Sequence, residues 1–397
     1  MTKPFFYTLA LLLAYASIST DLYLPALPEM SAALGTTQGA LEITVSTYLL
    51  GFAVGQLFWG PLSDRYGRKL PLAGGLVFFV IGSVGCAFST DVWHLIVGRT
   101  VQALGASASV VLARAMIRDL FQREEAARVL STLTAIMIIA PMLGPIIGAQ
   151  LLSISSWPII FILLACIGLA TLASLPKVIP ETLPSSSREQ IFLLSTLKHY
   201  WLLCTNRLFL SYALACATLN AGIFAFVAGS PFAYISYYNV SPTVYGILFA
   251  VNSLGIMAVN MLNRRLIPTY GGDRLLLIGA SCATIVGGLL VIITITGYAS
   301  LFAFALLLFL FVSSSGFIVA NSISGGLAAV QTGTGSASAL LGFAQYGGGM
   351  LGSSLLSLFA SGTPLPLAII TFLAGSACLL ATLVIVKERK RHVKKAA

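Results

Sequence analysis

The most regular feature of the sequence is a series of apolar runs, separated by short stretches that hold most of the polar and charged residues. Each run has about twenty residues, the length that an α-helix needs to cross the hydrocarbon layer of a bilayer. The first run follows Lys3 and has the length of a signal peptide, but the runs that follow it favour a retained first span. The pattern therefore predicts an all-α polytopic membrane protein with about twelve spans, at Phe5–Leu27, Leu41–Leu62, Leu70–Phe88, Leu95–Ile117, Val129–Leu152, Ile159–Leu175, Leu208–Phe226, Tyr245–Leu262, Leu275–Ile295, Leu301–Val319, Ser336–Leu358 and Leu365–Val386.

The longest polar stretch lies at the middle of the chain, at about residues 177–207, and contains Pro184 followed by three serines. It divides the predicted spans into two groups of six. We therefore expect an N-terminal six-helix bundle (residues 1–176), a cytoplasmic linker (177–206), a C-terminal six-helix bundle (207–386) and a basic cytoplasmic tail (387–397). The pair Tyr66-Gly67 precedes the third span and the pair Tyr270-Gly271 precedes the ninth, as an internal duplication would place them.

Lysine and arginine fall on one side of the membrane if the twelve spans alternate in direction. Cytoplasmic loops retain such residues, so the pattern predicts that both termini are cytoplasmic. Arg114 lies within about a turn of the basic side, and its long side chain can reach the interface. Arg99 is then the one basic residue committed to the membrane interior. The residues on the basic side are Lys3, Arg65, Arg68, Lys69, Arg118, Arg123, Arg128, Lys177, Arg188, Lys198, Arg207, Arg264, Arg265, Arg274 and those of the tail.

Composition excludes most classes of soluble protein. Hydrophobic residues make up 58% of the 397 residues and charged residues only 9%, against about a quarter charged in a typical soluble domain. The net charge of +10 lies in the short loops, which favours membrane anchoring over nucleic-acid binding. The cysteines show no spacing typical of a metal site or a disulfide framework, so we expect small buried side chains at Cys86, Cys166, Cys204, Cys216, Cys282 and Cys378.

The clearest motif lies between the second and third spans and reads Gly60-Pro61-Leu62-Ser63-Asp64-Arg65-Tyr66-Gly67-Arg68-Lys69. It resembles the signature loop of the major facilitator superfamily, whose fold pairs two six-helix bundles. Glycines permit the tight turn. We expect Asp64 to contact the N-terminus of the eleventh span, where free amide groups and the positive end of the helix dipole attract a carboxylate, and so to close the cytoplasmic side. The alternative is a loop that only anchors the chain at the membrane surface.

A second motif lies in span four, where Arg99, Gln102 and Gly105 follow one another at steps of three residues and share one helix face. The spacing resembles the superfamily motif associated with proton coupling. A charged side chain at this depth normally faces a cavity or a partner. The alternative is an interfacial arginine near the outer end of the helix.

Span five contains Pro141, Gly144, Pro145 and Gly148, close to the pattern that marks antiporters of the superfamily, although Ala140 replaces its first glycine. The prolines remove intrahelical hydrogen bonds and bend the helix. The glycines let a neighbouring helix pack closely, which is also what a purely structural role would require.

Two further strings resemble the bicyclomycin and chloramphenicol resistance branch of the drug:proton antiporters. The first span ends in Thr20-Asp21-Leu22-Tyr23-Leu24-Pro25-Ala26-Leu27-Pro28, and the seventh closes with Gly229-Ser230-Pro231-Phe232. The resemblance covers the whole chain in architecture and is specific in its motifs over spans one to five. It implies a multi-pass protein of the bacterial inner membrane, with no cofactor beyond the proton gradient, and we expect a monomer.

Asp21 and Arg99 are the candidates for proton coupling. Asp21 is the acid placed deepest inside a predicted span, where apolar surroundings favour its protonated form. A cationic substrate or a nearby Arg99 favours the ionised form, so proton and substrate can compete for one site. The alternative is a carboxylate wetted at the outer mouth, and Glu42, at the start of the second span, reads as interfacial.

Polar side chains at mid-span depth are candidates for lining a substrate cavity, because unsatisfied amides are unfavourable in hydrocarbon. Each polar side chain is equally compatible with a hydrogen bond between helices. An aromatic ring is equally compatible with a position that faces lipid. The candidates are Tyr23, Tyr48, Gln56, Gln102, Asn220, Phe224, Asn252, Asn321 and Gln345.

The function that these patterns favour is export of drugs or similar small amphipathic compounds in exchange for protons, by alternating access. Transporters with paired bundles hold their substrate near the middle of the membrane. An exporter or importer of a natural metabolite is the alternative. No nucleotide-binding Gly-x-x-x-x-Gly-Lys-[Ser/Thr] string is present, which disfavours ATP as the driver. A membrane enzyme is the least favoured class, because the histidines are dispersed and no paired carboxylates occur.

Overall fold

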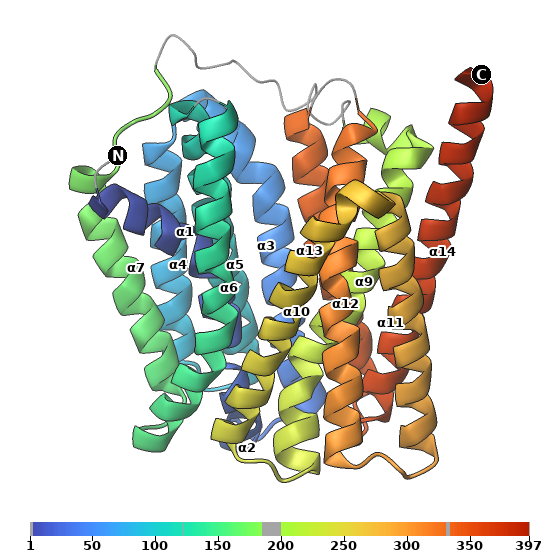
Figure 1. Cartoon of the computed structure of the whole chain (residues 1–397). Helices are drawn as coiled ribbons and strands as arrows, with labels where there is room; N and C mark the ends of the chain where they lie inside the picture. Colours follow the sequence, from blue (N-terminus) through green and yellow to red (C-terminus); the bar gives the residue numbers. More distant parts are fainter. Residues whose placement is uncertain (1–2, 122, 185–199, 331–333, 397) are drawn as a thin grey trace. The chain divides into compact units, whose positions relative to one another are not determined.

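The computed structural model describes residues 3–121, 123–184, 200–330 and 334–396, and the regular elements in these ranges are all helices (Figure 1). Ten of these helices are long and apolar enough to cross a membrane. Two further long helices, α6 (Arg123–Ile154) and α13 (Thr334–Leu358), complete the set of long helices in the described ranges. The predicted fold class, an all-α polytopic membrane protein, is confirmed.

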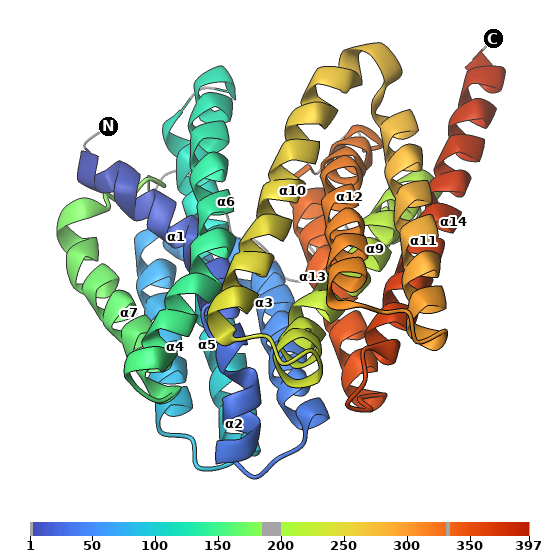
Figure 2. The same cartoon turned by 60° about the horizontal axis from the view of Figure 1, so that its bottom comes forward.

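The first half of the chain forms a bundle of long helices with two short ones after the first. Their bounds are α1 (Lys3–Asp21), η1 (Leu24–Ala26), α2 (Leu27–Ala33), α3 (Gln38–Tyr66), α4 (Lys69–Ala87), α5 (Val92–Leu120), α6 and α7 (Pro158–Val178). Helix α5 packs against α3 and α4, α4 packs against α7, and α1 packs against α5 and α6. Both views of the fold show α1, α4, α5, α6 and α7 side by side (Figures 1 and 2).

The second half forms another bundle. Its elements are α9 (Arg207–Pro231), η3 (Phe232–Tyr237), α10 (Pro242–Tyr270), α11 (Gly272–Ile295), α12 (Leu301–Ala328), α13 and α14 (Leu365–Ala396). Helix α9 packs against α12, α13 and α14, and α11 packs against α12 and α14. Helix α14 continues through most of the predicted basic tail, so the tail extends the last span as a helix.

Contacts between residues divide the chain into two compact units. Met1–Leu193 and Ser241–Ala250 form the first, and Leu194–Val240 and Val251–Ala397 form the second. The start of α10 therefore groups with the first bundle: a Cβ at Gly246 would lie 3.1 Å from the backbone nitrogen of Ile146 in α6. Of the predicted linker, residues 185–199 lie outside the described residues, and residues 200–205 are helical.

The first predicted span is interrupted in the structure. Helix α1 ends at Asp21, and the chain continues through η1 into α2. Pro25 and Pro28 lack the backbone N–H that a continuous helix uses, and the ring of Pro25 would meet the carbonyl of Asp21 four residues earlier, which favours a break at this point. The span predicted at Phe5–Leu27 is present, but it consists of α1, η1 and the start of α2 and not of one unbroken helix. The break leaves the last carbonyl groups of α1 without donors from their own helix.

The two Tyr-Gly pairs occupy equivalent turns. Gly67 joins α3 to α4 with a φ of 89°, and Gly271 joins α10 to α11 with a φ of 75°. Residues with side chains rarely adopt positive φ, so both turns favour glycine. The same turn thus recurs between the second and third helices that span each half, as an internal duplication requires.

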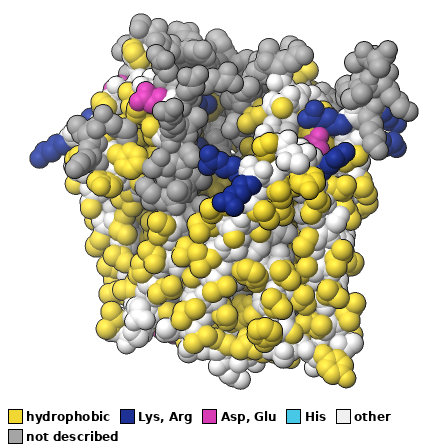
Figure 3. Space-filling view, in the orientation of Figure 1, with side chains coloured by type: hydrophobic (Ala, Val, Ile, Leu, Met, Phe, Trp, Pro, Cys, Tyr) yellow, Lys and Arg dark blue, Asp and Glu magenta, His cyan; other side chains and the backbone are white. Residues whose placement is uncertain are grey.

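The outer faces of the helices carry large apolar side chains, among them Phe58, Ile81, Trp93, Ile285, Phe302 and Leu380, which are all exposed. Figure 3 shows hydrophobic side chains over the sides of the helices, while in each unit the visible Lys and Arg side chains gather toward one end. Apolar surface on this scale would not be stable in water and fits contact with lipid.

Candidate functional site

The break at the end of α1 exposes a carbonyl group that a buried arginine uses. Arg99 lies on α5 and has no exposed surface. Its Nη1 donates a hydrogen bond of 2.8 Å to the backbone oxygen of Ser19, in the last turn of α1. A carbonyl in that position has no intrahelical donor once the helix ends. The interrupted helix therefore supplies one of the groups that hold the buried guanidinium.

Two tyrosine rings cover the faces of the same guanidinium. The Cζ atom of Arg99 lies 4.1 Å from the ring centroid of Tyr23 and 4.1 Å from that of Tyr48. A cation over an aromatic face is attracted by the negative face of the ring, most strongly where water is excluded. The two rings thus compensate part of the cost of burying a charge inside the bundle.

Hydrogen bonds extend from this stack across four helices. Arg99 Nη1 donates to Gln102 Oε1 at 2.6 Å, and Gln102 Nε2 donates to the Ser83 hydroxyl on α4 at 2.7 Å. The hydroxyl groups of Ser19 and Tyr48 form a hydrogen bond. The Tyr23 hydroxyl lies 3.2 Å from that of Thr44 on α3. The motif residues Arg99 and Gln102 are therefore brought together with two of the predicted cavity residues, Tyr23 and Tyr48.

One edge of the Arg99 guanidinium has no protein partner. Its Nε and Nη2 are buried, and neither donates a hydrogen bond to any described residue. These two N–H groups point along the same edge and match the two oxygens of a carboxylate. Because a buried donor without an acceptor is unfavourable, the edge is suited to an acidic group that arrives and leaves.

Asp21 lies at the last position of α1, two residues after Ser19, whose carbonyl oxygen accepts from Arg99. The side chain is buried, with 7% of its surface exposed. Within the described ranges it forms no ion pair or hydrogen bond, although the charge of Arg99 acts on its carboxyl group. The site therefore holds a buried acid and a buried base that are near each other and unpaired.

The motif of span five packs directly against Asp21. A Cβ at Gly144 would lie 3.0 Å from the Asp21 Cβ, and one at Gly148 would lie 1.9 Å from the Leu22 carbonyl oxygen. Pro141 and Pro145 lie inside α6 on either side of this contact. The glycines of the antiporter-like string therefore allow α6 to approach the α1 break that carries the acid.

The signature loop forms a separate cluster at the end of the first bundle. Arg68 donates to Asp119 at the end of α5, with its Nε 2.8 Å from Oδ2 and its Nη2 3.3 Å from Oδ1. It also donates to Asp64 and to the Ser63 hydroxyl. Asp119 is a partner that the motif did not reveal. The predicted contact of Asp64 with the eleventh span stays a prediction, and Arg65 stacks on the neighbouring Tyr66 ring.

The segment after α7 completes this cluster. The Glu181 carboxylate accepts hydrogen bonds from the backbone N–H groups of Arg68 at 2.8 Å and Lys69 at 3.2 Å, where α4 begins. The Thr182 hydroxyl donates to Asp119 at 3.0 Å. An acid at a helix N-terminus satisfies free amides and the helix dipole. These contacts have no local signal in the sequence, because Glu181 lies more than a hundred residues from Arg68 and Lys69.

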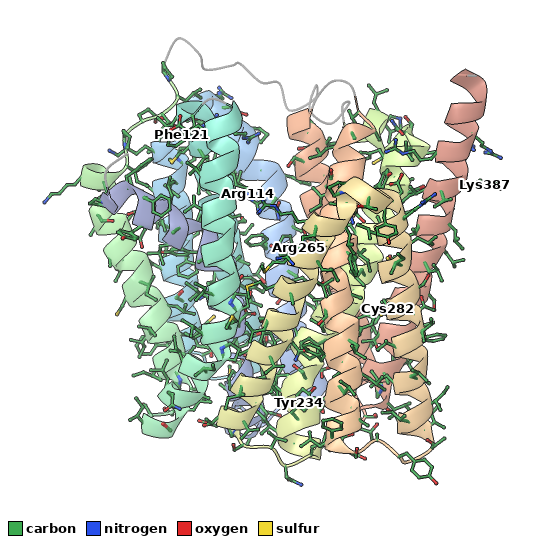
Figure 4. All side chains as sticks on the ribbon, viewed as in Figure 1. Arg114, Phe121, Tyr234, Arg265, Cys282 and Lys387 are labelled. Carbon is green, nitrogen blue, oxygen red and sulfur yellow. The ribbon has the colours of Figure 1, made fainter. Side chains whose placement is uncertain are left out.

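Charged side chains on α5 differ in depth along the helix. Arg114 is exposed, in agreement with a side chain that reaches the membrane surface. Figure 4 shows Arg114 on the span and Phe121 beyond the end of the same helix. Arg99, in contrast, lies fully inside the bundle, as the sequence indicated.

The remaining cavity candidates are dispersed. Gln56 on α3 is buried. In the second unit, Asn220 donates to the Cys216 carbonyl of its own helix at 2.8 Å. Asn321 donates to Asn263 of α10 at 2.9 Å, so it joins two helices. Asn252 is buried, Gln345 is half-buried, and the Phe224 ring lies 6.0 Å from that of Tyr346.

The second unit has its own charged cluster at the ends of three helices. The Tyr212 hydroxyl on α9 donates to Asp273 Oδ1 at 2.5 Å. Arg389 on α14 lies 3.3 Å from Asp273 Oδ2 and donates to the Tyr212 oxygen at 3.3 Å. Asp273 stands in the first turn of α11, directly after the Gly271 turn. The sequence pointed to the turn but not to its partners.

The cysteines do not all follow the predicted burial. Cys86, Cys216 and Cys378 are buried, but Cys166 and Cys204 are exposed and Cys282 is intermediate, and all are free. In a membrane protein an apolar side chain can be covered by lipid instead of protein, so burial inside the fold is not required. The ranges that the structure describes contain no group of three His, Cys, Asp or Glu side chains able to hold a metal ion.

A buried arginine and a buried acid inside a bundle of apolar spans are typical of a membrane transporter, because ionisable groups within the membrane mark substrate or ion pathways. Residues 9–353 match the Major Facilitator Superfamily, and the chain belongs to this superfamily. The predicted family is confirmed, and the protein is a transporter and not an enzyme.

Relatives and solved structures extend the comparison. The chain is 28% identical over 99% of its length to 98% of a bicyclomycin resistance protein homolog of Haemophilus influenzae. It is 31% identical over 88% of its length to 87% of the multidrug resistance protein MdtL of Citrobacter koseri. The crystal structure of a D-xylose-proton symporter superposes with a TM-score of 0.75 over 97% of both chains, at 16% identity, which shows a shared fold.

Proposed function

We propose that this transporter exports drugs or similar small amphipathic compounds across the inner membrane, in exchange for protons, by alternating access. The observation that carries the proposal is the open Nε–Nη2 edge of Arg99 beside a buried Asp21 that forms no ion pair among the described residues. A proton that binds Asp21 removes its negative charge, and a proton that leaves restores it. The pair can therefore exist in two states that differ by one proton.

The two states differ in what Asp21 binds. Ionised Asp21 satisfies both free N–H groups of Arg99, since a carboxylate accepts two parallel hydrogen bonds from that edge. Protonated Asp21 has no charge to hold there and is released into its apolar surroundings. Arg99 is fixed by two rings and two acceptors, so Asp21 is the member of the pair that moves.

The position of Asp21 couples this exchange to the helices. It ends α1 at the break, and α6 contacts it through Gly144. A change in its pairing therefore acts on the α1–α6 contact. The membrane potential can drive this change, because one charge that crosses the membrane supplies about 2.3 kcal/mol per 100 mV.

The names of the relatives support the class of substrate. One is named for bicyclomycin resistance and another for multidrug resistance, and both match most of the chain. With the basic ends of the helices in the cytoplasm, as the loop charges favour, protons enter from the opposite side and substrate leaves toward it. The acid and base of the first bundle then serve as the coupling group and its partner.

Accumulation of the fluorescent cation ethidium in cells tests the proposal. Cells that express the wild type should accumulate less dye than cells with an empty vector, and a protonophore should remove the difference. Asp21→Asn keeps the shape but cannot release a proton, so it should accumulate dye like the empty vector. Glu29→Gln, a change of an exposed acid on α2, is the matched control and should behave like the wild type.

Three results would overturn the proposal. Export that survives in Asp21→Asn would remove Asp21 from coupling, and export that is insensitive to the protonophore would remove protons. If the wild type exports no member of a panel of dyes and antibiotics, drug export is wrong.

A further inference from the structure

A second buried carboxyl group lies in the first unit, on α3. Glu42 has no exposed surface, although it stands near the start of the helix, where an interfacial position was expected. Its Oε1 accepts a hydrogen bond of 2.8 Å from Gln38 Nε2. Its Oε2 is buried and accepts no hydrogen bond from the described residues. Half of this carboxyl group is therefore without a donor.

No positive charge compensates Glu42. Among the described side chains, Gln38 is the one that acts on it. Arg99 directs its Nη1 to Ser19 and Gln102, and Arg65 stands some twenty residues away, about 30 Å along the same helix. Besides Glu42, the titratable and charged groups on α3 and on the elements packed against it, α2, α4 and α5, are Glu29, Tyr48, Asp64, Arg65, Tyr66, Lys69, Cys86, His94, Arg99, Arg114, Arg118 and Asp119.

The protonation state of Glu42 follows from its burial without a compensating positive charge. A buried carboxylate costs several kcal/mol unless a charge or several donors stabilise it. A neutral carboxylic acid carries no charge, so its burial costs less than that of a carboxylate, and its carbonyl oxygen accepts a hydrogen bond as Oε1 does from Gln38. One donor and no nearby cation, as at Glu42, fit the neutral acid.

We propose that Glu42 is a proton-binding site additional to Asp21, and that it exchanges its proton with water at the Gln38 end of α3. Gln38 is partly exposed in the first turn of the helix, so one hydrogen-bonded side chain separates the carboxyl group from the surface. On release, the Glu42 O–H bond breaks, water takes the proton and a carboxylate remains. The inference rests on the proposed proton exchange, in which a second loading group raises the number of protons per cycle.

Infrared spectroscopy of the purified transporter in lipid nanodiscs tests this site without any substrate. A protonated carboxyl group has a C=O stretching band that a carboxylate lacks. The wild type should show this band at neutral pH and lose intensity as the pH rises. Glu42→Gln, which has the same shape and can still accept from Gln38, should lack the Glu42 component. Glu29→Gln, the exposed control on α2, should leave the band unchanged.

A second measurement separates a proton carrier from an inert buried acid. Ethidium export by Glu42→Gln should change less steeply with external pH than export by the wild type. The proposal is overturned if Glu42→Gln keeps the full wild-type band, because Glu42 is then ionised. It is also overturned if the Glu42 component does not respond to pH or if the pH profile of export is unchanged. If proton-driven export itself is wrong, Asp21→Asn and the protonophore will leave ethidium export unchanged. The infrared measurement does not depend on export and still shows whether Glu42 binds a proton.

Discussion

Arg99 depends on aromatic faces as well as on hydrogen bonds, and substitutions of Tyr48 separate the two contributions. Tyr48→Phe keeps the ring over the guanidinium and removes the hydroxyl bond to Ser19, which should lower stability by about 1 kcal/mol. Tyr48→Leu also removes one of the two faces 4.1 Å from Arg99 Cζ, and should cost about 2 kcal/mol more in a desolvated site. Thermal unfolding of the purified variants in detergent measures both. Equal losses would show that the ring face does not stabilise the arginine.

At the scale of the residue, motif spacing pointed to Arg99, Gln102 and Arg68 but to few of their partners. Arg99 and Gln102 stand three apart on one helix, so the sequence places them together. Asp119 and Glu181, by contrast, reach Arg68 from 51 and 113 residues away. Side chains that meet across such separations leave no periodic pattern, because only the packing of helices brings them together.

At the scale of the element, the close contact of α6 with the break after α1 allows a test of the span-five motif. Gly148→Ala would place a Cβ 1.9 Å from the Leu22 carbonyl oxygen, so one backbone must shift. Overpacking of this kind costs typically about 1–3 kcal/mol. We expect a lower unfolding temperature and a loss of ethidium export. Gly85→Ala is the control, because its Cβ would meet its nearest neighbour at 3.9 Å, an ordinary contact.

The Gly148 result bears on coupling as well as on packing. If Gly148→Ala unfolds and exports like Gly85→Ala, close approach of α6 to Asp21 is not needed for transport.

Helix boundaries themselves were predicted within a few residues for most spans, since apolar runs and polar loops mark them. The break after Asp21 was missed, because hydrophobicity alone continues through Pro25 and does not register its missing N–H.

At the scale of the whole molecule, the loop charges predict which side of the membrane each end of the helices occupies. Alkaline phosphatase folds into its active form only outside the cytoplasm, whereas green fluorescent protein fluoresces inside it. Phosphatase fused after Ala397 should therefore be inactive and the fluorescent protein bright. Phosphatase inserted between α4 and α5, near Thr90, should be active. The reverse pattern would invert the topology and with it the direction of proton entry.

The sequence by itself determined the class of the protein: the spans and the superfamily follow from periodic hydrophobicity and local motifs, which depend on neighbours along the chain. Only the tertiary structure decided that Asp21 and Arg99 are near but unpaired, that Tyr23 and Tyr48 enclose the guanidinium, and that Glu42 is buried. These properties depend on which helix faces meet, and a pattern read along one helix does not contain that information.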